Sequence, residues 1–331
     1  MKITVLSDGG WGTALALLLL DNKHDVTIWG PFSDYVEEMK QTRRNDRFLK
    51  GAELPPALGL TANMATAAEA ELLVLAAPTQ FARSCLEQLA AIGTPTNAKI
   101  VNVSKGIEVG SLLRISELVE AVLGPVRYAD LSGPSHAEEV FRRVPTAVAV
   151  GSNDGELANE VQSVFMNHVF RVYTSDDVIG VELGGALKNV YAIAAGICDG
   201  MELGDNSKAA LMTRAIAEMG RLGVALGGRA ETFSGLSGIG DMIVTCCSGH
   251  SRNRHVGEEL GRGKALEQII EDMGMVVAEG VKTSESAYQL AEKVGAETPI
   301  IREVYASLYE GKDPRVVVRD LMSRDPRAER G

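Results

Sequence analysis

The first half of the chain alternates short apolar runs with longer segments of helical periodicity. The runs at 3–6, 26–29, 72–75 and 100–103 are continuous and rich in Val, Ile and Leu, which is typical of buried parallel strands. Helix-like segments stand between them, and further strands are indicated near 128–131 and 147–150, before a last helix–strand unit at about 156–173. The helix-like segments cover 11–20, 81–91 and 112–123. This alternation predicts an α/β fold with a doubly wound parallel sheet and right-handed crossovers.

From about Asp177 the pattern changes to longer segments rich in Ala, Gly, Leu and Met. The segment 181–196 is apolar on nearly every face, so we expect a central helix enclosed by other helices. The length of 331 residues also fits two domains, because single cores stop growing at roughly 250–300 residues. We therefore expect a sheet domain over 1–176 and an all-helical domain over 177–331.

Composition and charge narrow the class of protein. A formal net charge of -11 disfavours binding to nucleic acid or to an anionic membrane. The apolar stretch 14–20 is far shorter than the ~20 residues of a membrane-spanning helix, so we expect no such helix. No secretory signal is visible in the sequence. The four cysteines form no CxxC pair, which argues against a metal site and favours free, buried thiols in the cytoplasm.

A glycine-rich turn follows the first predicted strand. Gly9 and Gly12 match the second and third glycines of the dinucleotide fingerprint G-x-G-x-x-G, while Ser7 takes the first place. Gly9 would let the backbone approach a pyrophosphate, and Gly12 would let the helix pack closely on its strand. Asp8 would put an adverse charge beside that pyrophosphate. A plain strand–helix turn also explains two glycines, but the position directly after the first strand favours nucleotide binding.

The choice between NAD and NADP stays open. The acidic residue that holds the ribose hydroxyls is expected about 20 residues beyond the motif, at the end of the second strand. The segment 29–33 there contains no carboxylate, and the next one is Asp34. Arg43 and Arg44 could meet a 2′-phosphate, or they could form a solvated basic pair.

Lys188 lies inside the apolar segment of the second half. No acidic residue stands three or four positions away to pair with it along a helix. A lysine desolvated in this way has a lowered pKa and can act as a general base or acid near neutral pH. The alternative is a lysine whose side chain extends to the surface. Gly184 and Gly185 beside it suggest room for a ligand.

Other candidate residues follow predicted strands or begin predicted helices. Lys105 follows the strand at 100–103, and in open α/β sheets ligands bind beyond the carboxyl ends of strands. The segment 132–136 follows the next strand and offers amides, hydroxyls and the imidazole of His136, which is either catalytic or structural, for example in capping a helix.

Three more candidates lie in the second half. Ser251 is a good helix N-cap, and Arg252 beside a helix N-terminus suits a phosphate. Asp241 could orient a lysine or a substrate hydroxyl, or it could be an ordinary turn aspartate.

Taken together, these segments resemble the bacterial-type NAD(P)-dependent glycerol-3-phosphate dehydrogenases. The matching stretches run in family order across almost the whole chain, and the later ones are long and specific. They are 11–16, 105–106, 133–137, 184–200, 206, 209–214, 232–246, 251–254 and 279–280.

The resemblance implies an oxidoreductase with a Rossmann-type NAD(P)-binding domain at 1–176 and a helical substrate-binding and catalytic domain at 177–331. It implies that Lys188 accepts the proton of the substrate C2 hydroxyl while hydride passes from C2 to the nicotinamide. Implied substrate contacts are Lys105, Gly133, Ser135, Lys188, Asp241, Ser251, Arg252 and Asn253. The glycine-rich motif and the resemblance together give the cofactor contacts Gly9, Gly10, Trp11, Gly12, Lys105, Ala137, Arg252, Val277 and Glu279. A homodimer and a supply of glycerol 3-phosphate for glycerophospholipids are further family expectations.

Three positions depart from the family pattern. Ser7 stands where the family commonly has glycine, Gly10 where it often has serine, and Pro31 where some members have a polar cofactor contact. These departures bear on cofactor affinity and preference, not on the fold. Two alternatives stay in view: a dehydrogenase of another hydroxy acid or nucleotide sugar, against which the phosphate site at Ser251, Arg252 and Asn253 argues, and a dinucleotide-binding sensor without catalysis, which Ser7 and Asp8 suggest. The presence of Lys105, Lys188, Asp241 and Arg252 together argues against the sensor.

Overall fold

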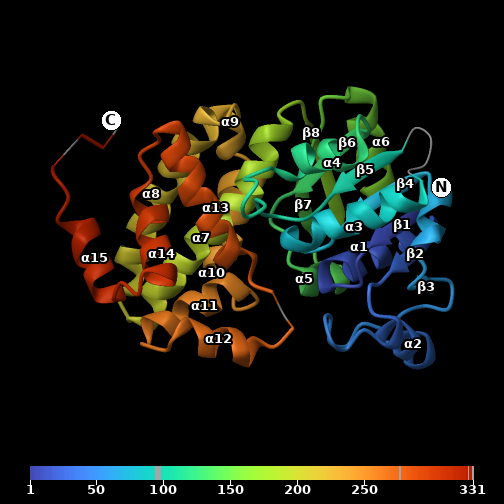
Figure 1. Cartoon of the computed structure of the whole chain (residues 1–331), viewed down its shortest axis with the longest axis horizontal. Coiled ribbons are helices and arrows are strands. Elements are labelled where there is room, and N and C mark those ends of the chain that lie inside the picture. Colours follow the sequence, from blue (N-terminus) through green and yellow to red (C-terminus); the bar gives the residue numbers. More distant parts are fainter. Residues whose placement is uncertain (94–97, 276, 327, 330–331) are drawn as a thin grey trace.

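A computed structural model describes residues 1–93, 98–275, 277–326 and 328–329 of the chain. Figure 1 shows two regions side by side, a sheet with helices around it in the first half of the chain and a bundle of helices in the second. The predicted fold class, a Rossmann-type sheet followed by a helical domain, is confirmed.

The sheet has eight strands in the order β3-β2-β1-β4-β5-β6-β7-β8. Parallel pairing places Val5 of β1 opposite Ile28 of β2 on one side and Val74 of β4 on the other, all of them buried. The strands are β1 (Lys2–Leu6), β2 (Asp25–Trp29), β3 (Gly59–Thr61), β4 (Leu72–Leu75), β5 (Lys99–Asn102), β6 (Arg127–Ser132), β7 (Thr146–Gly151) and β8 (Phe170–Ser175).

One junction corrects the expectation of a wholly parallel sheet. β7 runs antiparallel to β6, with Leu131 opposite Val150. The connection between them, residues 133–145, holds only the five-residue α5 (Ala137–Phe141), so no long helix crosses a face of the sheet here, as it usually does in a parallel βαβ unit. The short strand β3 and the helix α2 (Ser33–Thr42) are further elements that the pattern did not predict.

Helices cover both faces of the sheet (Figure 1). Beside α2 and α5 they are α1 (Gly10–Asp21), η1 (Met64–Glu69), α3 (Thr79–Ile92), α4 (Ile115–Leu123) and α6 (Gly155–Phe165). The apolar faces of α1 and α6 join the core under β1 and β8, where Leu15 and Phe165 are fully buried.

The helical domain is built around α7 (Val178–Gly200), as the pattern predicted. Residues 178–198 of this helix are all buried except Ile179, which is partly covered. By length and composition α7 could cross a membrane, but 94% of its apolar window is buried inside the protein, as in a core helix. The surrounding elements are α8 (Gly204–Ala225), α9 (Ala230–Phe233), the π-helical η2 (Leu236–Gly240), α10 (Asp241–Cys247), α11 (Arg252–Gly261), α12 (Leu266–Met273), α13 (Glu279–Val294), α14 (Pro299–Tyr309) and α15 (Pro314–Met322).

Glycines bring α11 against α7 backbone to backbone. A Cβ at Gly196 would lie 1.9 Å from the carbonyl oxygen of Arg254, and one at Gly257 would lie 1.9 Å from that of Ile193. Only glycine tolerates such an approach. The contact fixes the N-terminus of α11, with Ser251 and Arg252, relative to the helix that carries Lys188.

The proposed domain boundary falls in a short connection. β8 ends at Ser175, and α7 begins at Val178 with Asp177 as its N-cap, whose Oδ1 accepts a hydrogen bond from the amide of Gly180 at 2.9 Å. The division at 176/177 stays a prediction. Of the four free cysteines, Cys247 is exposed, contrary to the expectation of buried thiols, because it faces outward at the end of α10.

Candidate active site

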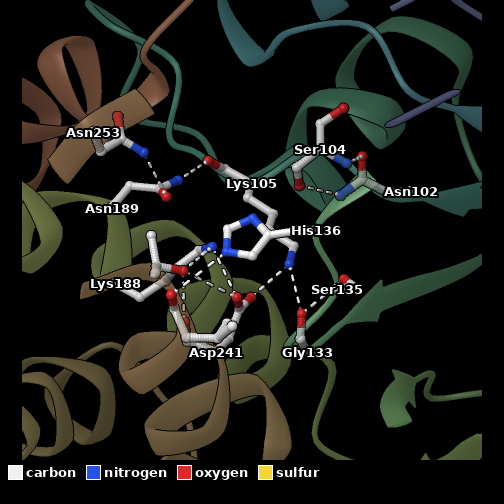
Figure 2. Close-up of polar contacts among 12 residues, drawn as sticks. Asn102, Ser104, Lys105, Gly133, Ser135, His136, Lys188, Asn189, Asp241 and Asn253 are labelled. Carbon is white, nitrogen blue, oxygen red and sulfur yellow. Dashed lines mark hydrogen bonds and ion pairs between the residues drawn. The ribbon is translucent and has the colours of Figure 1, made fainter. Parts of the chain in front are cut away.

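Lys188 is buried at the centre of α7 and has two partners from α10. Its Nζ donates hydrogen bonds to Oδ1 of Asp241 at 2.8 Å and to Oγ1 of Thr245 at 2.7 Å (Figure 2). Burial lowers the pKa of Lys188 to about 8; Asp241 opposes the shift, and the charge of Lys105 adds to it. The prediction of a desolvated lysine with a lowered pKa is confirmed, and the alternative of a side chain reaching the surface is wrong.

Asp241 bridges the two domains. Its Oδ2 accepts a hydrogen bond from Nζ of Lys105 at 2.5 Å, while Oδ1 binds Lys188. Lys105 lies on the loop after β5, and its Nζ also donates to the carbonyl oxygen of Gly133 at 2.9 Å. Burial alone would raise the pKa of Asp241, but the two lysines together hold it below its ordinary value. The ordinary-turn interpretation of Asp241 is therefore wrong: it is a buried counterion shared by two lysines.

We expected the glycines beside Lys188 to leave room for a ligand, and this expectation is wrong. A Cβ at Gly184 would lie 2.6 Å from the carbonyl oxygen of Ser237 in η2, and one at Gly185 would lie 2.5 Å from Oγ of Ser132 in β6. The two glycines instead let α7 approach elements on both sides. This packing draws α10, and with it Asp241, toward Lys188.

A chain of amide groups ties the lysine loop to α11. Asn189 donates from Nδ2 to the carbonyl oxygen of Lys105 at 2.9 Å and accepts from Nδ2 of Asn253 at 2.8 Å. Oδ1 of Asn253 in turn accepts from the amide of Gly280 at 2.9 Å. Both ends of the Asn253 side chain are thus held by protein groups, which shows a positioning role, and its contact with the substrate stays a prediction.

The N-terminus of α11 presents a free guanidinium. Ser251 caps the helix as predicted, since its Oγ accepts from the amide of Arg254 at 3.2 Å. Arg254 itself is paired with Asp199 and Glu258. Arg252 is exposed, and no hydrogen bond or ion pair with the described part of the chain holds it. It is therefore available for an anionic ligand at the helix N-terminus.

The loop after β6 closes the site from the sheet side. Gly133 has φ 150°, and a Cβ there would lie 2.9 Å from Cα of Val148, so this position requires glycine. Its carbonyl oxygen accepts from Oγ of Ser135 at 2.8 Å as well as from Lys105.

His136 begins α5, but its side chain makes no capping hydrogen bond. Its ring lies toward Lys188 and Asp241 (Figure 2) and 5.9 Å from the ring of His250. Burial first, and then the charge of Lys188, lower the pKa of His136. The structure thus excludes the capping role and leaves a neutral imidazole at the site.

The glycine-rich turn has the predicted packing. A Cβ at Gly12 would lie 2.6 Å from the carbonyl oxygen of Ser7, which confirms that Gly12 serves close contact between α1 and β1. No side chain caps the N-terminus of α1 at Gly9, so its first amides can face an anion. A Cβ added at Gly10 would lie 2.5 Å from the carbonyl oxygen of Phe48 and 4.0 Å from Cβ of Ala137.

Several buried polar atoms around this turn and the domain interface lack a partner among the described residues. Glu279, at the start of α13, accepts from the amide of Thr79 at 2.9 Å through one oxygen only. Within the described residues the unpartnered buried atoms here are Trp11 Nε1, Thr79 Oγ1, Ser132 Oγ, Glu279 Oε2 and Thr283 Oγ1. Buried polar groups are normally hydrogen-bonded, so this set indicates a site for a polar ligand. Val277, half-buried, precedes Glu279 on the same segment.

Comparison with known sequence families decides the relationship. The N-terminal part of the NAD-dependent glycerol-3-phosphate dehydrogenase family matches residues 2–158, and its C-terminal part matches residues 177–319. The chain belongs to this family. The family resemblance drawn from the sequence motifs is thereby confirmed.

Individual relatives agree over nearly the full length. The chain is 50% identical to a glycerol-3-phosphate dehydrogenase [NAD(P)+] of Geobacillus kaustophilus, across 99% of this chain and 96% of that protein. It is 50% identical to the enzyme of the same name from Geobacter metallireducens, across 100% and 99%. Among solved structures, glycerol-3-phosphate dehydrogenase of Coxiella burnetii superposes with a TM-score of 0.94 at 36% identity, covering 98% of this chain and 99% of that one.

The structure adds residues that the sequence argument did not single out. Thr245 and Asn189 contact Lys188 and Lys105, and Thr79 contacts Glu279 across the domains. Thr245 and Asn189 lie in stretches that match the family, and Thr245 stands four residues after Asp241, one helical turn away. That spacing, together with the matching stretch, is the signal that could have found it. Among the described residues, no group of three or more His, Cys, Asp or Glu side chains is arranged to hold a metal ion.

Proposed function

We propose that this chain interconverts sn-glycerol 3-phosphate and dihydroxyacetone phosphate, with NAD or NADP as hydride carrier. The observation that carries the proposal is the Lys188–Asp241–Lys105 bridge, which joins a proton-transfer lysine of the helical domain to the nucleotide-binding domain. Arg252 at the N-terminus of α11 supplies the site for the phosphate.

Lys188 is suited to move the proton of the substrate hydroxyl. With a pKa lowered to about 8, a substantial fraction of its amine is neutral near physiological pH and can accept that proton. The nicotinamide, when bound, accepts the hydride from C2 in oxidation and returns it in reduction. Asp241 and Thr245 fix the position of Nζ, and Lys105 places a second positive charge beside the oxygen on which negative charge develops.

We assign substrate contacts to Lys105, Gly133, Ser135, Lys188, Asp241, Ser251 and Arg252, with Asn253 positioning α11 through Asn189. Cofactor contacts are assigned to Gly9, Gly10, Trp11, Gly12, Lys105, Ala137, Arg252, Val277 and Glu279. The unpartnered atoms of Trp11 and Glu279 support this assignment.

The cellular setting is part of the same proposal. The chain would work in the cytoplasm as a homodimer and supply glycerol 3-phosphate for glycerophospholipid synthesis. Four free cysteines accord with a reducing compartment. Sedimentation equilibrium would test the dimer, since a monomer at micromolar concentration would contradict it.

The test is the loss of NADH or NADPH absorbance with three substrates: dihydroxyacetone phosphate, unphosphorylated dihydroxyacetone, and a 2-oxo acid. Turnover should require the phosphorylated ketone. Arg252→Ala should raise KM for it by roughly tenfold to a hundredfold, in line with a charge-assisted contact of about 1.5–3 kcal/mol. Arg262→Ala is the matched control, because Arg262 lies beyond the C-terminal end of the same helix α11 and its ion pairs within the described ranges are with Glu258 and Glu259. Preference for the 2-oxo acid would indicate a dehydrogenase of another hydroxy acid. If none of the three substrates were turned over, the result would favour a sensor.

A further inference from the structure

The end of β2 carries no acidic residue in this chain, although dinucleotide-binding folds place one there to hold the adenosine ribose. The residue at that place is Gly30. A Cβ on Gly30 would lie 2.5 Å from Oδ2 of Asp8 and 2.8 Å from Cγ2 of Val36. The carboxylate of Asp8, which comes from the turn after β1, therefore occupies the space of the missing side chain at position 30.

The backbone of Asp8 is held by two hydrogen bonds, while one oxygen of its carboxylate has no partner among the described residues. The carbonyl oxygen of Asp8 accepts from Nδ2 of Asn45 at 2.7 Å and from Oγ1 of Thr13 at 3.3 Å. The residue is only 3% exposed, yet its Oδ2 has no hydrogen-bond donor among the described residues. A buried acceptor without a donor is uncommon in native proteins, and a ribose hydroxyl is a donor of the right kind.

The charge of Asp8 persists at physiological pH. Burial raises its pKa to about 6, and a hydrogen bond from its own backbone amide and, to a lesser extent, the guanidinium of Arg47 limit that rise. Arg47 stacks on the ring of Tyr35, 3.8 Å from its centroid, and its other charged neighbour is Glu38 on α2. The carboxylate is thus largely ionised above pH 7 and faces one partly exposed cation.

The two arginines considered for a 2′-phosphate are already engaged. Arg43 donates to the carbonyl oxygens of Leu54 and Leu58, each at 3.0 Å, and to that of Pro55. Arg44 pairs with Asp46 at 2.8 Å. These contacts hold the segment after α2 in place and leave neither guanidinium directed to a ligand.

We propose that Asp8 accepts a hydrogen bond from the 2′-hydroxyl of the adenosine ribose and so makes this chain select NAD(H) over NADP(H). A 2′-phosphate would bring negative charge against a poorly solvated carboxylate, where charges are screened less than in water. The adverse effect first expected of Asp8 on the pyrophosphate is replaced by a role at the ribose, because its side chain turns toward β2. This inference rests on the proposed function only in taking the ligand to be a nicotinamide dinucleotide.

The test is a calorimetric titration with ADP-ribose and with 2′-phospho-ADP-ribose, which probe the adenosine end without any turnover. The wild-type chain should bind ADP-ribose at least roughly tenfold more tightly, a difference of about 1.4 kcal/mol. Asp8→Asn should remove most of that preference. Asp34→Asn is the matched control: it removes the same charge from an exposed carboxylate on the first turn of α2, and should leave the preference intact.

Equal or tighter wild-type binding of 2′-phospho-ADP-ribose would overturn the inference without any variant. So would a loss of preference in Asp34→Asn but not in Asp8→Asn. If Asp8→Asn does not fold, as judged by circular dichroism, Asp8→Ala is used in its place. A chain that prefers ADP-ribose but fails to reduce dihydroxyacetone phosphate would refute the proposed function and leave the role of Asp8 standing.

Discussion

Replacing Asp241 by asparagine should shift the pH dependence of the reaction, because this carboxylate is the buried counterion of both lysines. It is 1% exposed and lies 2.8 Å from Nζ of Lys188 and 2.5 Å from Nζ of Lys105. Its charge opposes the desolvation that lowers the pKa of Lys188. Asparagine keeps the shape of the side chain and removes that charge, so the ammonium form of Lys188 loses stabilisation.

The size of the shift follows from the contact. A hydrogen bond to a charged group contributes about 1.5–3 kcal/mol, and one pH unit corresponds to about 1.36 kcal/mol. The pH midpoint for oxidation of glycerol 3-phosphate should therefore fall by about 1–2 pH units. Leaving the buried Lys188 and the partly buried Lys105 without their counterion should also cost about 3–5 kcal/mol of unfolding free energy.

The assay is the pH profile of kcat/KM for oxidation of glycerol 3-phosphate, with unfolding by urea measured in parallel. Asp176→Asn is the control, because that exposed carboxylate pairs with Arg229 at the surface, away from Lys188, and its replacement should leave the midpoint unchanged. A midpoint in Asp241→Asn equal to that of the wild type would refute the argument that Asp241 sets the charge of Lys188.

Three further predictions concern the pH profile of the wild-type chain and substitutions at Ser7 and at Gly184. Oxidation by the wild-type chain should rise with pH through about 8, and reduction should fall over the same window, since the neutral amine of Lys188 accepts the proton and the ammonium returns it; pH-independent rates between pH 7 and 9 would contradict this. Ser7→Gly should stabilise the fold by about 1 kcal/mol, because Ser7 has φ 133°, and it should tighten cofactor binding modestly. Equal or weaker cofactor binding in a calorimetric titration would refute the expected gain in affinity. Gly184→Ala should lower the free energy of unfolding in urea by about 1–3 kcal/mol, since its Cβ would lie 2.6 Å from a backbone oxygen. Gly220→Ala is the control, because a Cβ there would have nothing within 4 Å, and it should be neutral or stabilising by up to about 1 kcal/mol. Equal effects of the two substitutions would contradict the packing argument.

Local pattern was enough for much of the fold. The run Leu72–Leu75 is apolar at every position, and all four side chains are buried in the strand β4, so its interpretation as a central strand depended on no other part of the chain. The same holds for the apolar helix around Lys188. The antiparallel return of β7 could not be predicted, because the strand itself has the same composition in either direction. The direction is established by the pairing itself, which places Leu131 opposite Val150 and Ser132 opposite Ala149.

Long-range contacts limit what the sequence shows of the site. Lys188 could be predicted to be desolvated from its neighbours along the helix, but its partner Asp241 lies 53 residues away. The sequence also does not predict the direction in which a side chain points. Asp8 was expected to face the pyrophosphate, and the contact that places its carboxylate against Gly30, beyond the end of β2, appears only when β1 and β2 are paired.

The most direct test of the central claim compares the wild-type chain with Lys188→Ala. NADH loss with dihydroxyacetone phosphate is followed by absorbance, and NADH binding is followed by fluorescence on the same samples. The account predicts rapid turnover in the wild type and none above background in Lys188→Ala, with NADH binding and the folded spectrum unchanged. Turnover in the variant at the wild-type rate would remove Lys188 from the chemistry.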